Sequence, residues 1–343
     1  MRLPKPLALS GLSTWLPDDR QTAHQAVAQG LVEADTADDL GYSALPVATE
    51  AAPEMAVLAA RAALESARIA PAELGLVLHA WMYYQGHDLW SPPHYIADQL
   101  GARQAEPLGI QQVCNGGAAA IEVGAARLLA DPDLKYAMVT TADRFAAPGF
   151  DRWRGDYGIA YGDGATAMLL HFHEARSADL LLHAIATVAA PQLERMHRGH
   201  DEFGLTPRSV SAQVDMRRTK KAFLEQEGIE AFTRASGDSL NAVVGRCLDS
   251  AGLSAESPRL RYVIPPRLGT KSLELAYVPA LRKMLGTAEV LTKGRDTGHL
   301  GAGDAAASLA ELHVERRLAP GEFALLVSAG AGFTWSCLLV GAA

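Results

Sequence analysis

Residues 111–120 constrain this chain more than any other stretch, because they place a cysteine between a strand and a helix. A short apolar run precedes the stretch, and an alanine- and leucine-rich run at 121–129 follows with helical spacing. The pattern predicts a strand, a sharp turn at Cys114 and then a helix. A helix N-terminus offers a positive dipole end and unpaired N–H groups, and both favour the nucleophilic thiolate. Gly116 and Gly117 would allow a tight turn and a close approach of substrate.

Two interpretations of Cys114 remain open from this stretch alone. In the functional one, the thiolate is a nucleophile that carries an acyl group. In the other, the side chain is a small buried hydrophobe, which is the commoner fate of a lone cysteine.

Charge and cysteine usage exclude several classes of protein. The 343 residues carry a net charge of -8, and no dense basic block appears, so a nucleic-acid partner is not expected. Three widely separated cysteines form neither a disulfide framework nor a metal-ligand spacing, which predicts a reducing cytoplasm and no metal. Residues 1–16 contain prolines and lack a long apolar core, so no signal peptide is expected. No apolar run reaches the ~18–20 residues of a membrane helix.

Strands and helices alternate along the whole chain, which predicts an α/β protein with mostly buried sheets. Each half ends in a strand, a glycine-rich turn and a returning strand, the second turn covering residues 329–332. We therefore expect an internal duplication, with halves at residues 1–174 and 175–343. Within the second half, residues 216–227 and 228–251 are predicted to be helical.

A second group of chemically active residues lies in Gly-His-Leu-Gly-Ala-Gly-Asp, residues 298–304, before an alanine-rich helix. His299 could take a proton from Cys114 or from a substrate alcohol, thiol or amine. Asp304 would orient the imidazole and stabilise its charged form. The alternative is that Asp304 only caps the helix and His299 is an ordinary loop residue.

Other candidate residues have a structural interpretation beside the functional one. His197 and His200 lie in a polar loop and are expected at the surface, with a substrate-lining role second. Asp163, between two glycines, is expected to be a turn residue. Six further side chains could line a pocket or belong to the core or an interface: Trp81, Tyr83, Tyr84, His87, Trp90 and His94. The other two cysteines, Cys247 and Cys337, are expected in the core.

Together these residues resemble the thiolase-like superfamily, and within it the ketoacyl-acyl-carrier-protein synthase III group. The resemblance covers nearly the whole chain. Three stretches carry it: Val-Cys-Asn-Gly-Gly at 113–117, Tyr-Gly-Asp-Gly-Ala at 161–165 and Ser-Ala-Gly-Ala-Gly-Phe-Thr-Trp at 328–335. It implies a five-layered αβαβα fold of two related halves, usually as a homodimer. It also implies an oxyanion hole formed by the N–H of Cys114 and one from the 330–333 turn, assigned here to Gly332.

The chain departs from the condensing members of that group at two positions. They carry a histidine after the proline that follows the 260–264 strand, where this chain has Pro266, and an asparagine where it has His299. Their two side chains stabilise the enolate formed by decarboxylation, and losing one such donor typically costs ~10²–10³ in rate. With His299 and Asp304 in a Gly-His-x-x-x-x-Asp pattern, the chain instead resembles ketosynthase III-like acyltransferases of natural-product (polyketide) pathways.

The preferred hypothesis is a ping-pong acyltransferase that uses Cys114, His299 and Asp304. Its donor would be an acyl-carrier-protein or coenzyme A thioester, so that phosphopantetheine or CoA enters with the substrate and no other cofactor is expected. Its acceptor could be a second carrier protein, a sugar hydroxyl or an amine. The alternatives are a decarboxylative condensing enzyme and a catalytically silent partner subunit.

An acidic carrier protein would need a local basic rim. The densest basic cluster is Arg217, Arg218, Lys220 and Lys221. Arg267 and Lys271 follow the Pro-Pro turn and are predicted near the active-site entrance, where Arg267 would contact the carrier. Solvated charged faces are the alternative for both clusters.

Overall fold

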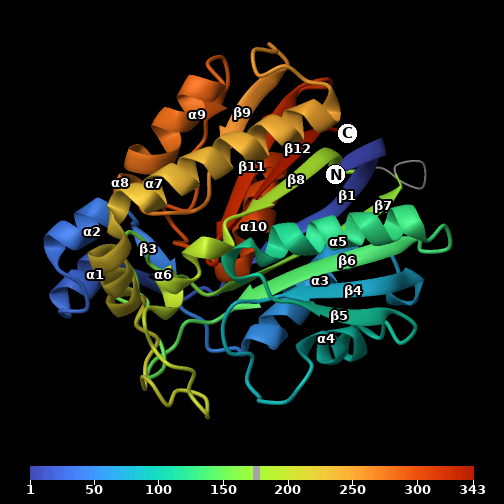
Figure 1. The fold of residues 1–343 in the computed structure, drawn as a ribbon. Helices are drawn as coiled ribbons and strands as arrows, with labels where there is room; N and C mark the ends of the chain where they lie inside the picture. The colour runs from blue at the N-terminus through green and yellow to red at the C-terminus, as the bar shows by residue number, and fades with distance from the viewer. Residues whose placement is uncertain (173–177) are drawn as a thin grey trace.

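Strands from both halves of the chain form one ten-stranded sheet in the computed structural model, which describes residues 1–172 and 178–343 (Figure 1). The strands are β1 (Arg2–Trp15), β4 (Leu74–Ala80), β5 (Glu106–Ile110), β6 (Tyr136–Asp143), β7 (Gly164–Phe172), β8 (Leu180–Ala189), β9 (Leu260–Ile264), β10 (Glu289–Val290), β11 (Phe323–Gly330) and β12 (Thr334–Ala342). A separate ribbon pairs β2 (Arg20–Thr22) with β3 (Ala44–Pro46).

The two halves of the sheet have the same topology. In the first half the order is β1-β7-β6-β4-β5, and in the second it is β8-β12-β11-β9-β10. In each half the first two pairings are antiparallel and the last two are parallel. Antiparallel pairing of β1 with β8, with Leu7 opposite Leu182, joins the halves. This correspondence is the expected internal duplication, although the expected boundary at 174/175 lies outside the described residues.

Helices fill the connections between these strands. In the first half they are α1 (Ala23–Ala28), α2 (Ala34–Leu40), α3 (Ala52–Ala67), α4 (Pro92–Leu100) and α5 (Gly116–Ala130), with the 3₁₀ turns η1 (Pro71–Glu73) and η2 (Val113–Asn115). In the second they are α6 (Arg195–Arg198), α7 (Met216–Ala251), α8 (Thr270–Ser272), α9 (Val278–Met284) and α10 (Asp304–Val314), with η4 (Pro191–Leu193), the π-helical η5 (Leu273–Tyr277) and the 3₁₀ turn η6 (Gly301–Gly303).

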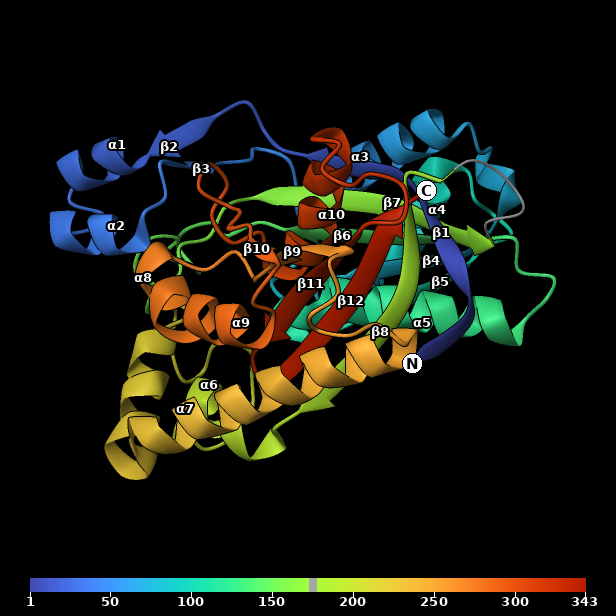
Figure 2. The same ribbon diagram turned by 90° about the horizontal axis from the view of Figure 1, so that it is seen from above.

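Alternating side chains on each strand separate three hydrophobic cores. On β4, Leu76 and Leu78 face a central core that includes α5 and α10, whereas Val77 faces the other side, where α3 and α4 pack. On β11, Leu326 faces the same central core and Leu325 faces α7 and α9. The resulting layers are α3–α4, the first half of the sheet, α5–α10, the second half of the sheet, and α7–α9. Figure 2 shows α3 and α7 on opposite outer sides with α10 between them, as the αβαβα prediction requires.

Local sequence predictions hold with small changes. The α7 path is broken at Gly228, whose φ of 75° is outside the helical region, so the two predicted helices meet there. The closing turn is shorter than predicted, because β11 continues through Ala329 to Gly330. Cys247 and Cys337 are fully buried, and all three cysteines are free.

Candidate active site

Cys114 lies in η2, directly before the central helix α5, and is half-buried. The preceding Val113 has a φ of 50°. A β-branched side chain rarely adopts this left-handed conformation, and such strain is concentrated at functional sites. The strained residue therefore lies immediately before the cysteine.

The glycines after the cysteine serve packing rather than the turn itself. Gly116 already has a helical φ of -55°. A Cβ on Gly117 would lie 2.4 Å from the Ala302 carbonyl oxygen, and a Cβ on Gly116 would lie 3.2 Å from the Ala302 Cβ. These glycines thus let the start of α5 approach η6, the turn that leads into α10.

The second half brings His299 and Asp304 to this point. The His299 Nδ1–H donates to Asp304 Oδ2 at 2.5 Å, and both side chains are buried. The same carboxylate accepts the Leu300 N–H at 2.8 Å and the Arg267 N–H at 3.1 Å. Asp304 is the first residue of α10 rather than its cap, which is Gly303. Its carboxylate therefore orients the imidazole.

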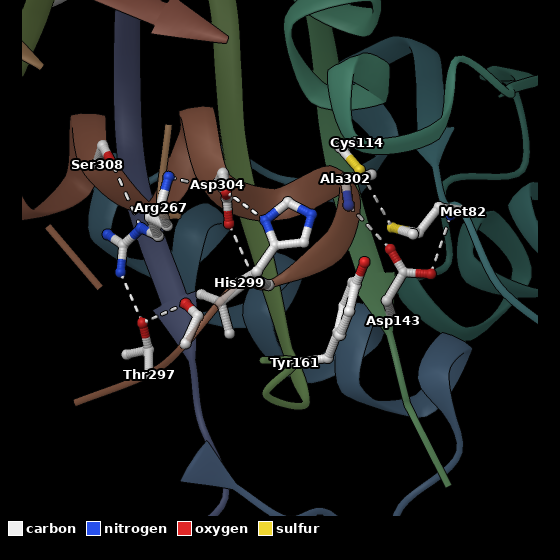
Figure 3. Close-up of polar contacts among 12 residues, drawn as sticks. Met82, Cys114, Asp143, Tyr161, Arg267, Thr297, His299, Ala302, Asp304 and Ser308 are labelled. Carbon is white, nitrogen blue, oxygen red and sulfur yellow. Dashed lines mark hydrogen bonds and ion pairs between the residues drawn. The ribbon is translucent and has the colours of Figure 1, made fainter. Parts of the chain in front are cut away.

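The other imidazole nitrogen faces the cysteine. Figure 3 shows the His299 Nε2 edge directed toward Cys114. That nitrogen is buried and has no hydrogen-bond partner among the described residues, while the thiol donates to Met82 Sδ at 3.7 Å. Burial lowers the pKa of His299, but the charge of Asp304 and the nearby Cys114 raise that pKa to well above 6.5. The geometry thus supplies a thiol beside an imidazole that favours its protonated form.

The Tyr161 side chain lies below the His299 imidazole in Figure 3. Its ring packs edge-on against His299 at 5.2 Å between centroids, and its hydroxyl donates to Asp156 Oδ2 at 3.0 Å. Phe145 and Phe150 pack around Tyr161, and these three rings are called the aromatic wall below. The sequence analysis used Tyr161 only as part of a family pattern and missed this contact with His299.

The prediction that Asp163 is a turn residue is wrong. Its carboxylate is fully buried, accepts the N–H groups of Ala48 at 2.9 Å and Phe145 at 2.8 Å, and pairs with Arg152 at 3.1 Å. Two distant segments supply these donors, so spacing in the sequence could not reveal them.

The prediction that Arg267 contacts a carrier at the entrance is also wrong. The side chain is 0% exposed and donates to Ser308, Thr297 and Glu311. A buried guanidinium needs such a set of acceptors. Arg267 therefore supports the segment behind Asp304 and is not available at the surface.

The predicted substrate-lining residues have different surroundings. Trp81 is half-buried and stacks on His79, whereas His87 and Trp90 are exposed and pack edge-on at 5.4 Å. His200 is exposed. His197 is half-buried with its ring 5.1 Å from Phe333, in the turn assigned to the oxyanion hole. Burial, with the charge of Lys220, lowers the pKa of His197 to about 4.

A basic depression lies beyond the aromatic wall. Its volume is about 510 Å³, and its charged lining side chains are Arg154, Arg217, Arg218, Lys221, Asp151 and Asp215. Met216 connects the two regions, because its sulfur lies 3.9 Å from the Tyr161 hydroxyl and its neighbour Arg217 lines the depression. Of the predicted basic cluster, Lys220 instead pairs with the buried Asp156.

Metal and membrane sites are not found in the described part of the chain. Within residues 1–172 and 178–343, no three His, Cys, Asp or Glu side chains are grouped to hold a metal ion. Over the same residues, no helix combines the length and apolarity needed to span a bilayer.

Comparisons with known proteins identify relatives of this sequence and fold. Residues 108–187 match the family model for 3-oxoacyl-[acyl-carrier-protein (ACP)] synthase III, and residues 261–342 match its C-terminal model. The beta-ketoacyl-[acyl-carrier-protein] synthase III of Pectobacterium atrosepticum is 26% identical over 290 residues, 83% of each chain. The solved structure of "ChlB3 [Aceyltransferase]" is 31% identical, covers 98% of each chain and has a TM-score of 0.89. The synthase III of Aquifex aeolicus has the same fold, with a TM-score of 0.77 at 20% identity over 98% of this chain and 99% of its own.

Proposed function

The chain belongs to the 3-oxoacyl-[acyl-carrier-protein] synthase III family of thiolase-like enzymes, and from this premise we propose that it is a ping-pong acyltransferase. The acyl group passes from a carrier-protein or CoA thioester to Cys114 and then to a second acceptor. Family membership makes the protein an enzyme of the transferase class, and the likeness to ChlB3 supports acyl transfer rather than condensation.

One observation carries the proposal: the buried His299–Asp304 pair beside Cys114. A carboxylate-bound imidazole is the arrangement that a general base and acid requires. The two side chains of condensing relatives would instead donate hydrogen bonds to an enolate, and Pro266 has no side-chain donor for that task. The site is therefore suited to move protons.

The proposed reaction has two transfers through one acyl-enzyme. The Cys114 thiolate attacks the thioester carbonyl, the C–S bond of the donor breaks, and the departing thiolate takes the His299 proton. The acceptor then attacks the Cys114 thioester while His299 Nε2 removes the acceptor's proton. Collapse of that intermediate releases the acylated acceptor and restores the Cys114 thiolate beside the His299 imidazolium, without any net oxidation.

Backbone N–H groups would hold the negative oxygen in both transfers. We assign them to Cys114 and Gly332. The closeness of the two turns supports this assignment, since a Cβ on Gly330 would lie only 2.6 Å from the Asn115 backbone nitrogen.

The basic depression suits a donor that carries phosphate, such as CoA or a phosphopantetheine arm. Four cationic side chains outnumber two carboxylates in its lining, despite the net charge of -8. CoA or phosphopantetheine would arrive with the acyl group, so the scheme requires no separate cofactor.

A homodimer is part of the proposal. Three large apolar side chains are exposed: Leu89 at 108%, Leu205 at 100% and Phe203 at 87%. Contact of these side chains with water is unfavourable, and a partner surface would cover them. Their segments lie together, because Arg208 donates to the Tyr83 hydroxyl at 2.6 Å. Analytical ultracentrifugation should give twice the 36.4 kDa chain mass, and a Leu205→Glu variant should dissociate.

Intact-protein mass spectrometry against a panel of acyl-CoA and acyl-carrier thioesters tests the function. We expect an acyl adduct on Cys114 that disappears when the acceptor is added and never forms in Cys114→Ala. Release of CO₂ from a malonyl thioester, with a product two carbons longer, would establish a condensing enzyme instead. No adduct with any donor, together with ordinary thiol reactivity, would indicate a silent subunit.

A further inference from the structure

The proposed reaction does not use Asp143, a fully buried carboxylate at the end of β6. Its Oδ2 accepts the Ala302 N–H at 2.9 Å. Its Oδ1 accepts the N–H groups of Met82 and Tyr83, each at 2.9 Å. Figure 3 shows the carboxylate between the Ala302 and Met82 segments. A carboxyl group buried this deeply, with no side-chain hydrogen-bond partner among the described residues, calls for an explanation.

Its three donors belong to two segments that lie beside the reacting groups. Met82 contacts the Cys114 sulfur at 3.7 Å. Ala302 lies in η6, between His299 and Asp304, and packs against Gly117 at the start of α5. Asp143 therefore joins the segment beside the thiol to the turn that carries the imidazole and its carboxylate.

The site requires a carboxylate of this size. An amide has one acceptor oxygen, so it would turn its NH₂ group toward a backbone N–H on one side. A longer side chain would displace η6, because Gly301 approaches so closely that a Cβ there would lie 2.2 Å from Asp143 Oδ2. The φ of Gly301 is 62°, which also favours glycine.

The carboxylate is also close enough to His299 to interact with its charge. Burial raises the pKa of Asp143 to about 7, against the lowering effects of the three N–H groups and of His299. Around His299 the titratable groups are Asp304 on α10, Cys114 in η2, Tyr161 before β7 and Asp143 on β6. Asp143 is thus a second carboxylate near the imidazolium, from a different strand.

We infer that Asp143 is a positioning residue, which holds the Met82 segment and η6 at the separation needed for proton transfer between Cys114 and His299 and adds negative charge beside the imidazolium. The inference deepens the proposed function and rests on it.

Alkylation of Cys114 by iodoacetamide, followed by mass spectrometry, tests the positioning without any acyl donor or acceptor, and the pH profile of acyl transfer tests the added charge. In Asp143→Asn the reaction should be at least about tenfold slower, since a misplacement of about 1 Å can cost ~10² in rate. The alkaline limb of the pH profile of acyl transfer should also move to lower pH, because loss of a nearby negative charge lowers the pKa of the His299 imidazolium. A purely structural defect would lower the rate at every pH without moving that limb.

Asp163→Asn is the matched control. Asp163 is another fully buried carboxylate that accepts two backbone N–H groups, from Ala48 and Phe145, and it pairs with Arg152. Phe145 packs on the Tyr161 ring, and among the described residues none of the three partners has a hydrogen bond or ring contact with Cys114 or the His299 imidazole. We expect it to lower the melting temperature without moving the limb. Equal effects of both substitutions, or a wild-type profile in Asp143→Asn, would overturn the inference.

Asp143→Glu keeps the charge and decides the matter if the asparagine variant does not fold. It should retain the wild-type alkaline limb but react more slowly, because the extra methylene displaces η6. Wild-type speed in this variant would refute the positioning role. If Cys114 in the wild-type protein reacts with iodoacetamide no faster than free cysteine, the proposed function is overturned as well. The wild-type rate therefore separates failure of the proposed function from failure of the role of Asp143.

Discussion

At the scale of single residues, the proposed chemistry depends on how completely Asp304 is held. Three N–H donors, from the His299 ring and from the backbones of Leu300 and Arg267, occupy its two oxygens. The carboxylate cannot turn away from the imidazole without leaving a buried donor unpaired, which costs about 1–3 kcal/mol. The imidazole therefore keeps its Nδ1–H on Asp304 and its Nε2 toward the thiol.

Asp304→Asn should impair transfer more than it impairs folding. The amide cannot accept from all three donors, and it no longer selects the imidazole tautomer. The same change in a serine-protease triad costs ~10⁴ in turnover, and we expect a smaller loss because a thiolate depends less on its base. Single-turnover acylation and transfer rates, with circular dichroism as the control for folding, measure the effect. Unchanged turnover would remove Asp304 from the mechanism.

The raised pKa of His299 also makes stability depend on pH. The unfolded imidazole titrates near 6.5 and the folded one well above it, so protonation stabilises the folded state fully below about pH 6.5. This contribution is lost as pH rises through the folded pKa. The difference in unfolding free energy between wild type and His299→Gln, from urea titrations, should therefore decline above neutral pH. A difference that grows with pH would contradict the assignment of the imidazolium.

Sequence reasoning found the residues whose signals are local and missed those whose partners are distant. Cys114, His299 and Asp304 each belong to a glycine-rich stretch that leads into a helix. Asp143 lies 159 residues from Ala302, so no local pattern could reveal that bond. Arg267 follows two prolines in an apparently exposed turn, yet it is buried because α10 supplies its acceptors.

At the scale of elements, the two central helices bring the halves of the site together. Cys114 lies in the 3₁₀ turn before α5, and His299 lies just ahead of η6, the 3₁₀ turn that leads into α10. The turns before α5 and α10 are equivalent in the two halves, but one carries a thiol and the other an imidazole. Alanine and glycine along α5 and α10 allow the close contact. The repeated order of elements was predictable from the sequence, but the contact between Gly117 and Ala302 was not.

Gly117→Ala should separate these helices. The new Cβ would meet the Ala302 carbonyl oxygen at 2.4 Å, so η6 and His299 must shift. We expect a lower melting temperature and slower transfer. Gly237→Ala in α7 is the matched control: apart from the adjacent backbone of its own helix, no described atom lies within 4 Å of the new Cβ, and alanine there should stabilise by up to ~1 kcal/mol with full activity. Equal activity of the two variants would show that the helix contact does not position the site.

At the scale of the whole molecule, an acidic protein carries a basic depression, to which we assign the donor. The alternation of strands and helices was predictable because it is a local property of the sequence, whereas the five αβαβα layers were expected from the family resemblance. The surface was less predictable, since Lys220 pairs with a buried Asp156 and Arg218 with Asp201. Of the predicted basic cluster, Lys221 has the most exposed side chain in the depression, at 70%.

Lys221→Glu should therefore distinguish donors by their charge. Reversing this charge should lower the association rate of an acidic carrier-protein donor by about threefold or more at low ionic strength, a part of the ~10–10³ that a whole charged cleft supplies. The effect should fade as salt rises, and a short neutral thioester should react as with wild type. Lys283→Glu makes the same charge change at an exposed site on α9 and should leave both donors unaffected. Stopped-flow acylation of Cys114 measures all four combinations. If Lys221→Glu slows both donors equally, or if Lys283→Glu matches it for the carrier, the depression is not where the carrier docks, and the donor enters by another face.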